Sequence, residues 1–107
     1  MNKKYILRKN IDIENVIKNG KKLVNKFFVV YYYPNNISNS RFCVSVNKKI
    51  GKAYIRNSFK RKIKNIIYKN KMYNKKYDYV IIVRNSVLNL DYFDIKRELI
   101  NLMKGEE

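Results

Sequence analysis

Histidine is absent from the 107-residue sequence, and acidic residues are few, with eight Asp and Glu against 25 Lys and Arg. Without histidine, no imidazole is available as a general base or as a metal ligand. The carboxylates are also scattered: Asp12 and Glu14 lie on different sides of a predicted helix, whereas Asp91 and Asp94 suit a helix N-terminus. Phosphodiester hydrolysis by a protein needs a general base or carboxylates grouped around metal ions. We therefore expect no catalytic residue, no protein-bound metal and no autonomous nuclease.

Cysteine occurs once, at Cys43, so an internal disulfide is impossible and a reducing compartment is consistent with the sequence. The simplest role for Cys43 is that of a small buried hydrophobic residue. Long apolar stretches are missing too, because the longest uncharged run of this kind, residues 27–33, is too short to cross a bilayer. The basic N-terminus is not followed by the apolar core of a signal peptide. We expect a cytoplasmic protein without a membrane partner.

Negative charge is missing from the whole centre of the chain. Between Asn15 and Tyr77 there is no Asp or Glu, yet this stretch holds 17 Lys and Arg. The formal net charge of +17 far exceeds what solubility requires. A charge of this size must meet a polyanion or repel itself, so nucleic acid is the expected partner.

The hydrophobic pattern predicts one domain over residues 1–107, with no repeat or linker. Apolar residues at helical spacing predict helices over 12–19, 53–70 and 91–103, and Gly20 suits the end of the first. Aromatic, β-branched or alternating residues predict strands over 26–33, 41–47 and 77–84. The order α, β, β, α, β, α indicates an α+β sandwich of helices on a small sheet.

The predicted helix 53–70 is apolar on one side and basic on the other. At about 100° per residue, the side opposite the apolar residues consists of Asn57, Lys60, Arg61 and Lys64. A solvated helix face usually mixes charges of both signs, whereas this side has no carboxylate, which favours phosphate binding. We call the following set the basic ridge: Lys48, Lys49, Lys52, Arg56, Asn57, Lys60, Arg61 and Lys64.

The predicted strand 26–33 is apolar or aromatic on both faces. Phe27, Val29, Tyr31 and Tyr33 alternate with residues of the opposite face, which includes Phe28. One face could pack on helices while the other stacks on bases, or both could be buried. The sequence alone leaves these alternatives open.

Residues 45–64 resemble the signature of the ribonuclease P protein family, roughly S-V-x-K-K-x-G-x-A-V-x-R-N-R-x-K-R-x-x-R. Further similarities follow in order along the chain: residues 8–13 to the start of the first helix, 19–21 to the segment after it, 28–31 to an F-V-L-Y strand, and 77–80 to a D-Y-V strand. The sequence departs from the family pattern in places: Ser58 replaces an arginine and Lys64 replaces the last arginine of the signature. Ile13 and Ile17 stand at positions of the first helix that are aromatic in the family.

The resemblance implies a fold like the second domain of a small-subunit ribosomal protein, with a left-handed β-α-β crossover that is rare in proteins. It implies a protein subunit of ribonuclease P, which removes 5′ leaders from precursor tRNA. The ridge would face the catalytic RNA, and that RNA would perform the hydrolysis with Mg²⁺ that it mainly binds itself. A cleft for the single-stranded leader would be lined by Ile13, Ile17, Phe28 and Tyr31.

Other classes of protein remain as alternatives. Composition alone also suits a ribosomal or other structural RNA-binding protein. A DNA-binding protein would need side chains that read bases and usually a dimer seam, whereas the ridge consists mostly of lysine, which suits phosphate. We therefore expect RNA partners, namely the catalytic RNA and precursor tRNA, and no DNA.

Overall fold

The computed structural model describes residues 3–105. All six predicted helices and strands are present, together with one strand that was not predicted and three short 3-10 helices. The main elements are α1 (Asn10–Asn19), β1 (Lys21–Val24), β2 (Phe28–Pro34), β3 (Arg41–Val46), α2 (Ala53–Lys69), β4 (Tyr77–Val83) and α3 (Tyr92–Met103). The 3-10 helices are Lys3–Tyr5, Lys48–Ile50 and Asn85–Asn89.

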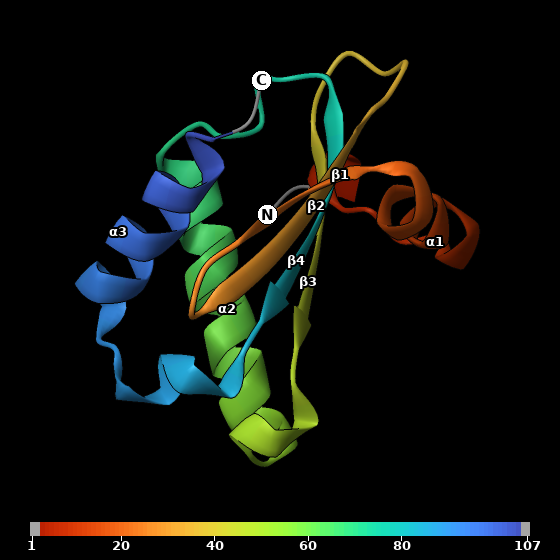
Figure 1. Ribbon diagram of the computed structural model, residues 1–107. Helices are drawn as coiled ribbons and strands as arrows, with labels where there is room; N and C mark the ends of the chain where they lie inside the picture. Colours follow the sequence, from red (N-terminus) through yellow and green to blue (C-terminus); the bar gives the residue numbers. More distant parts are fainter. Residues whose placement is uncertain (1–2, 106–107) are drawn as a thin grey trace.

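The four strands form one mixed sheet in the order β1-β2-β4-β3. β2 is antiparallel to both of its neighbours, whereas β3 and β4 are parallel and are connected through α2. In Figure 1 the chain descends along β3, rises along α2 and descends again along β4, which lies nearer the viewer. This path is the left-handed β-α-β crossover that the sequence resemblance implies.

Helices cover the two faces of the sheet unequally. α2 and α3 lie side by side on one face, and α1 lies alone on the other (Figure 1). The main core forms between the sheet and the helix pair, where α2 buries Phe59, Ile63, Ile66 and Ile67. α3 adds Ile95, Leu99 and Met103 to the same core. The helical periodicity predicted these buried positions because residues three and four apart share one side of a helix.

A smaller apolar cluster lies under α1. Leu7, Val16 and Val80 are buried there, with partly buried residues around them. Leu7 belongs to the N-terminal segment, and its backbone N–H donates to the carbonyl oxygen of Phe42 at 2.8 Å. Ile6 pairs with the same residue as an isolated parallel bridge, so this segment lies against the outer edge of β3.

Gly20 ends α1, as predicted, although its role differs from that of a left-handed cap. Its φ of −79° is accessible to any residue. A Cβ atom at this position would come within 2.6 Å of the backbone oxygen of Tyr32 and would also meet the carbonyl oxygen of Val16. Glycine is therefore required by the close approach of the end of α1 to β2.

No helix within residues 3–105 is both long enough and apolar enough to span a bilayer.

Candidate nucleic-acid interface

The basic ridge forms one continuous side of α2 and of the turn before it. Lys48 and Lys49 lie in the 3-10 helix, Lys52 precedes α2, and all three side chains are exposed. The side chain of Asn47 accepts a hydrogen bond from the N–H of Lys49 at 2.9 Å and so fixes the start of this turn. Gly51, at φ 145°, adopts a backbone conformation that other residues rarely reach.

Along α2, Asn57 and Arg61 are exposed, whereas Lys60 and Lys64 are half-buried. The ion pairs of Arg41 and Arg97 lie outside the ridge, and between described residues no ion pair involves a ridge cation. The ridge therefore presents uncompensated positive charge at helical spacing, an arrangement that suits a row of phosphates.

Arg56 is unusual among the ridge residues because its Nε atom is buried without a hydrogen-bond partner. An unsatisfied donor of this kind is costly in a folded protein. The side chain therefore loses no hydrogen bond from Nε if it turns outward toward an acceptor.

Ser58 stands where the family signature has an arginine. It lines an open pocket of about 390 Å³ together with Arg61, Lys62, Asn65 and Tyr92. The hydroxyl group of Tyr92 donates to Oδ1 of Asn65 at 3.3 Å, which connects α3 to the rim of this pocket.

The ridge is electrostatically connected to the sheet face that carries α1. Burial raises the pKa of the Cys43 thiol above its ordinary value, and the positive charges of Lys60 and Lys64 partly oppose this shift. Cys43 itself packs with the cluster under α1. α2 packs against β3, the strand that carries Cys43, so the ridge and this face of the sheet are joined through β3.

Two of the four predicted leader-contacting residues lie together on that face. Ile13 and Tyr31 both pack against the cluster of Leu7, Val16 and Val80. The Lys22 ammonium lies 5.8 Å from the centre of the Tyr31 ring, within range of a cation–π contact. Ile17 is also on α1, one turn after Ile13, and is 41% exposed.

The placement of Phe28 was wrong. This residue is fully buried, with 0% of its surface exposed, and belongs to the core between the sheet and the helix pair. Side chains alternate along a strand, so Phe28 and Tyr31, three residues apart on β2, point to opposite faces. Phe28 cannot contact a ligand beside α1.

Sequence reasoning missed other residues of this face. Tyr31, Val80 and Cys43 form one row across β2, β4 and β3. Ile82 is partly buried against the same cluster. The alternation of residues 41–47 assigns Cys43 to the side opposite Phe42, but only the strand pairing brings Cys43 and Tyr31 into one row.

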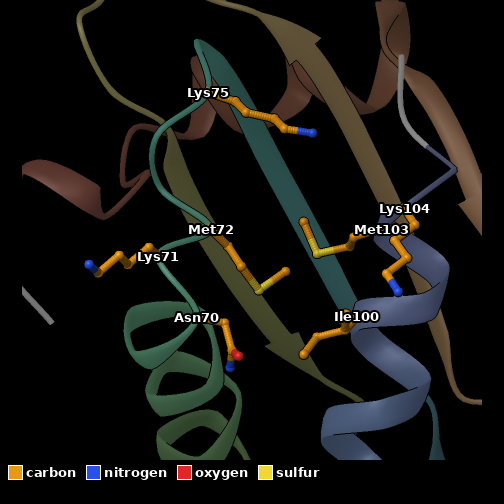
Figure 2. A pocket seen from close by; sticks show the side chains of 7 residues that line it. All are labelled: Asn70, Lys71, Met72, Lys75, Ile100, Met103 and Lys104. Carbon is orange, nitrogen blue, oxygen red and sulfur yellow. The ribbon is translucent and has the colours of Figure 1, made fainter.

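A separate pocket of about 340 Å³ lies between the C-terminal ends of α2 and α3. In Figure 2, Met72 and Met103 project toward each other across it, and the Lys75 side chain extends over it. None of the predicted RNA-contacting residues lines this pocket, which Asn70, Lys71, Ile100 and Lys104 complete.

Residues 3–105 contain no group of three or more His, Cys, Asp or Glu side chains placed to hold a metal ion.

Comparison with known proteins gives a consistent result along the chain. The family model described as Ribonuclease P matches residues 1–106. The ribonuclease P protein component of Streptococcus agalactiae serotype Ia is 36% identical over 104 residues, which cover 97% of this chain and 95% of that protein. The protein of the same name from Listeria monocytogenes serotype 4b is 39% identical over 106 residues, covering 97% and 89%.

Solved structures agree with the sequence comparisons. The RNase P protein from Thermotoga maritima has a TM-score of 0.87 and 34% identity, covering 95% of this chain and 97% of that one. A Staphylococcus aureus RNase P protein mutant, described as defective in mRNA degradation activity, has a TM-score of 0.89 and 32% identity, covering 95% and 87%.

Proposed function

The chain belongs to the ribonuclease P protein family, and we propose that it binds the catalytic RNA of ribonuclease P and the 5′ leader of precursor tRNA to promote leader removal. One observation carries the proposal: α2, which carries the uncompensated basic ridge, packs against β3, and β3 places Cys43 in one row with Val80 and Tyr31 on the sheet face under α1. Two different surfaces thus meet at β3. The basic ridge is charged and suits a folded RNA, whereas the sheet face beside α1 is apolar and aromatic and suits a single strand.

The ridge is the surface proposed to hold the catalytic RNA. Its lysines and arginines attract phosphates and release counterions from the RNA, which provides affinity without reading a sequence. Arg56 turns its guanidinium outward to a phosphate, since its buried Nε has no partner to lose. Lys64, which replaces an arginine of the family signature, supplies the charge without the planar two-donor geometry of a guanidinium.

The sheet face beside α1 is the surface proposed to contact the leader. Tyr31 is half-exposed and offers a ring for stacking, while Ile13 and Ile17 of α1 offer apolar contacts. Lys22, close to the Tyr31 ring, and the lysines across β3 supply positive charge for the leader phosphates. The proposed set on this face is Ile13, Ile17, Tyr31 and Cys43, without Phe28.

Hydrolysis is assigned to the RNA subunit. Residues 3–105 hold no group of three or more carboxylates and the sequence holds no histidine, so this part of the chain offers neither the metal cluster nor the imidazole that protein nucleases use. The role of the chain is to bind both RNAs and to screen the repulsion between their phosphates. Membership of this family disfavours the alternative of a ribosomal protein.

Reconstitution tests the proposal. The purified chain, freed of RNA, is assayed with precursor tRNA alone and again with the catalytic RNA at low Mg²⁺. Correct 5′ cleavage should require the RNA and should be stimulated by the chain. Arg61→Ala should weaken assembly more than Arg97→Ala, which removes the same charge from α3. Cleavage by the chain alone, or equal assembly by both variants, would contradict the proposed roles.

A further inference from the structure

Three tyrosines form a stack that extends from the C-terminal part of α2 to the N-terminal 3-10 helix. The rings of Tyr68 and Tyr73 have centroids 5.9 Å apart and an interplanar angle of 27°. Tyr73 in turn faces Tyr5, with centroids 4.5 Å apart and an angle of 32°. Tyr68 and Tyr73 are stacked, and Tyr5 lies tilted against Tyr73, both at separations typical of aromatic pairs.

The stack has one covered end and one open end. The Lys4 ammonium lies 5.0 Å from the centre of the Tyr5 ring and covers that end. Tyr73 is half-buried and packs on the main core. Tyr68 is 54% exposed, and within residues 3–105 Tyr73 is the only ring that stacks on it. A further flat ring can therefore be added at Tyr68.

Tyr68 lies in line with the basic ridge. It follows Lys64 by one helical turn and Arg61 by two, so the three side chains share one side of α2. Lys69 and Lys71 lie next in the chain and are exposed. No acidic residue occurs between Asn15 and Tyr77, so the stretch of chain that carries the open ring favours a polyanion.

We propose that Tyr68, supported by Tyr73 and Tyr5, is a stacking site for an unpaired base of the RNA that the ridge binds. This inference rests on the proposed function, because the ridge must hold RNA for a base to reach the ring. Tyr68 would contact a nucleobase, whereas the cations of the ridge contact only phosphates. The supporting rings hold Tyr68 in place, so stacking restricts little further side-chain motion.

A structural alternative is that the stack only fastens the N-terminal segment to α2. Stacking and fastening predict different results, because only stacking depends on the bases of the ligand. A base stacked on an aromatic ring responds to loss of the ring, whereas a phosphate chain without bases does not. Two probes therefore separate the possibilities: a short oligoadenylate RNA and an inorganic polyphosphate of similar charge.

The experiment measures the affinity of the full chain for both probes in four variants. Tyr68→Leu should weaken oligoadenylate binding by about 5- to 150-fold, the usual effect of one lost base stack, and should leave polyphosphate binding unchanged. Tyr68→Phe, which keeps a ring, should bind both probes as the unmodified chain does. Phe93→Leu removes a ring of α3 that is even more exposed than Tyr68, at 73%, and should change neither affinity. Arg61→Ala should weaken both.

The outcomes distinguish failure of this inference from failure of the proposed function. If Tyr68→Leu behaves like Phe93→Leu while Arg61→Ala weakens both probes, the ridge binds RNA and the stacking site is refuted. If Tyr68→Leu weakens both probes equally, or lowers the melting temperature without affecting the preference for oligoadenylate, the stack is structural and the inference is also refuted. If Arg61→Ala changes neither affinity, the proposed function itself fails.

Discussion

Arg41 and Asp78 face each other as direct neighbours across β3 and β4 and form a two-point ion pair. The Nε atom of Arg41 donates to Oδ1 of Asp78 at 2.9 Å, and Nη2 lies 2.6 Å from Oδ2. This hydrogen bonding is the main cause that raises the pKa of the Arg41 guanidinium above its ordinary value. A weaker contact of 3.9 Å joins Nη1 to Oδ2 of Asp12, so one guanidinium connects the sheet to α1.

Arg41→Ala should lower the free energy of unfolding by about 3 kcal/mol, because it leaves the buried Asp78 carboxylate without its cation. Urea unfolding followed by circular dichroism measures the change. Arg97→Ala is the matched control, since its exposed contacts with Asp94 and Glu98 should contribute less than about 1 kcal/mol. Equal losses in the two variants would show that the Arg41 pair is no stronger than a surface pair.

Tyr31→Ala, assembled with the catalytic RNA, should weaken binding of leader-bearing tRNA by about 1–3 kcal/mol, the range for one stacked base. Mature tRNA, which has no leader, should bind almost unchanged. Affinities for both tRNAs are measured together with the melting temperature, because Tyr31 also packs on the cluster under α1. Equal losses for both tRNAs with a large fall in melting temperature would exclude a leader contact.

Phe28→Ala should behave differently from Tyr31→Ala. Removing this fully buried ring should cost about 3–5 kcal/mol of stability. At a temperature where the variant is still folded, its preference for precursor over mature tRNA should equal that of the unmodified chain. A selective loss of leader binding would contradict the assignment of Phe28 to the core.

Cys43 reports on the region between the ridge and the leader face. Burial raises its pKa and Lys60 and Lys64 lower it, so Lys64→Gln should raise the pKa further. Because the thiolate is the reactive form, iodoacetamide should then label Cys43 more slowly at a given pH near 8. Mass spectrometry of the labelled chain follows the rate, with Lys96→Gln on α3 as the control. Faster labelling of Lys64→Gln would contradict the predicted electrostatic effect.

Lys71→Gly should stabilise the fold by about 1 kcal/mol. Lys71 has φ 52° and follows Asn70, the C-cap residue of α2, at a position where glycine adopts this conformation without steric cost. Its neighbour Met72 donates its N–H to the carbonyl oxygen of Ile67 at 3.1 Å, which completes the helix end. Lys69→Gly, inside the last turn of α2, should instead destabilise by up to about 1 kcal/mol. Thermal unfolding of both variants gives the signs, and a loss at Lys71 would contradict this account.

The long elements were predictable because each has a buried side with a clear period. The apolar side of α2 and the run of β4 stand out from the sequence, since their burial depends on local spacing. β1 was missed because its four residues include two lysines and bury little surface. β1 is stabilised by its antiparallel pairing with β2. Pairing with another strand produces no clear residue pattern in a segment of this length.

Of the candidate interface, the basic ridge was predictable from the sequence, whereas the composition of the leader face was predictable only in part. The ridge residues lie on one helix and its preceding turn, so local spacing alone brings them together. The leader face combines α1, β2, β3 and β4, and its composition depends on strand order and register. Resemblance to a family motif placed Phe28 there, although the alternation of side chains already separated it from Tyr31.

The N-terminal segment beside β3 has a consequence for how the protein behaves at high concentration. A free sheet edge is a template on which a second chain can add a strand and begin aggregation. Here Ile6 and Leu7 occupy part of the outer edge of β3. The opposite edge, β1, carries the exposed Lys21 and Lys22, whose charges repel another copy. Both edges of the sheet are thus protected against self-association, and shortening the chain at its beginning would remove one of these protections.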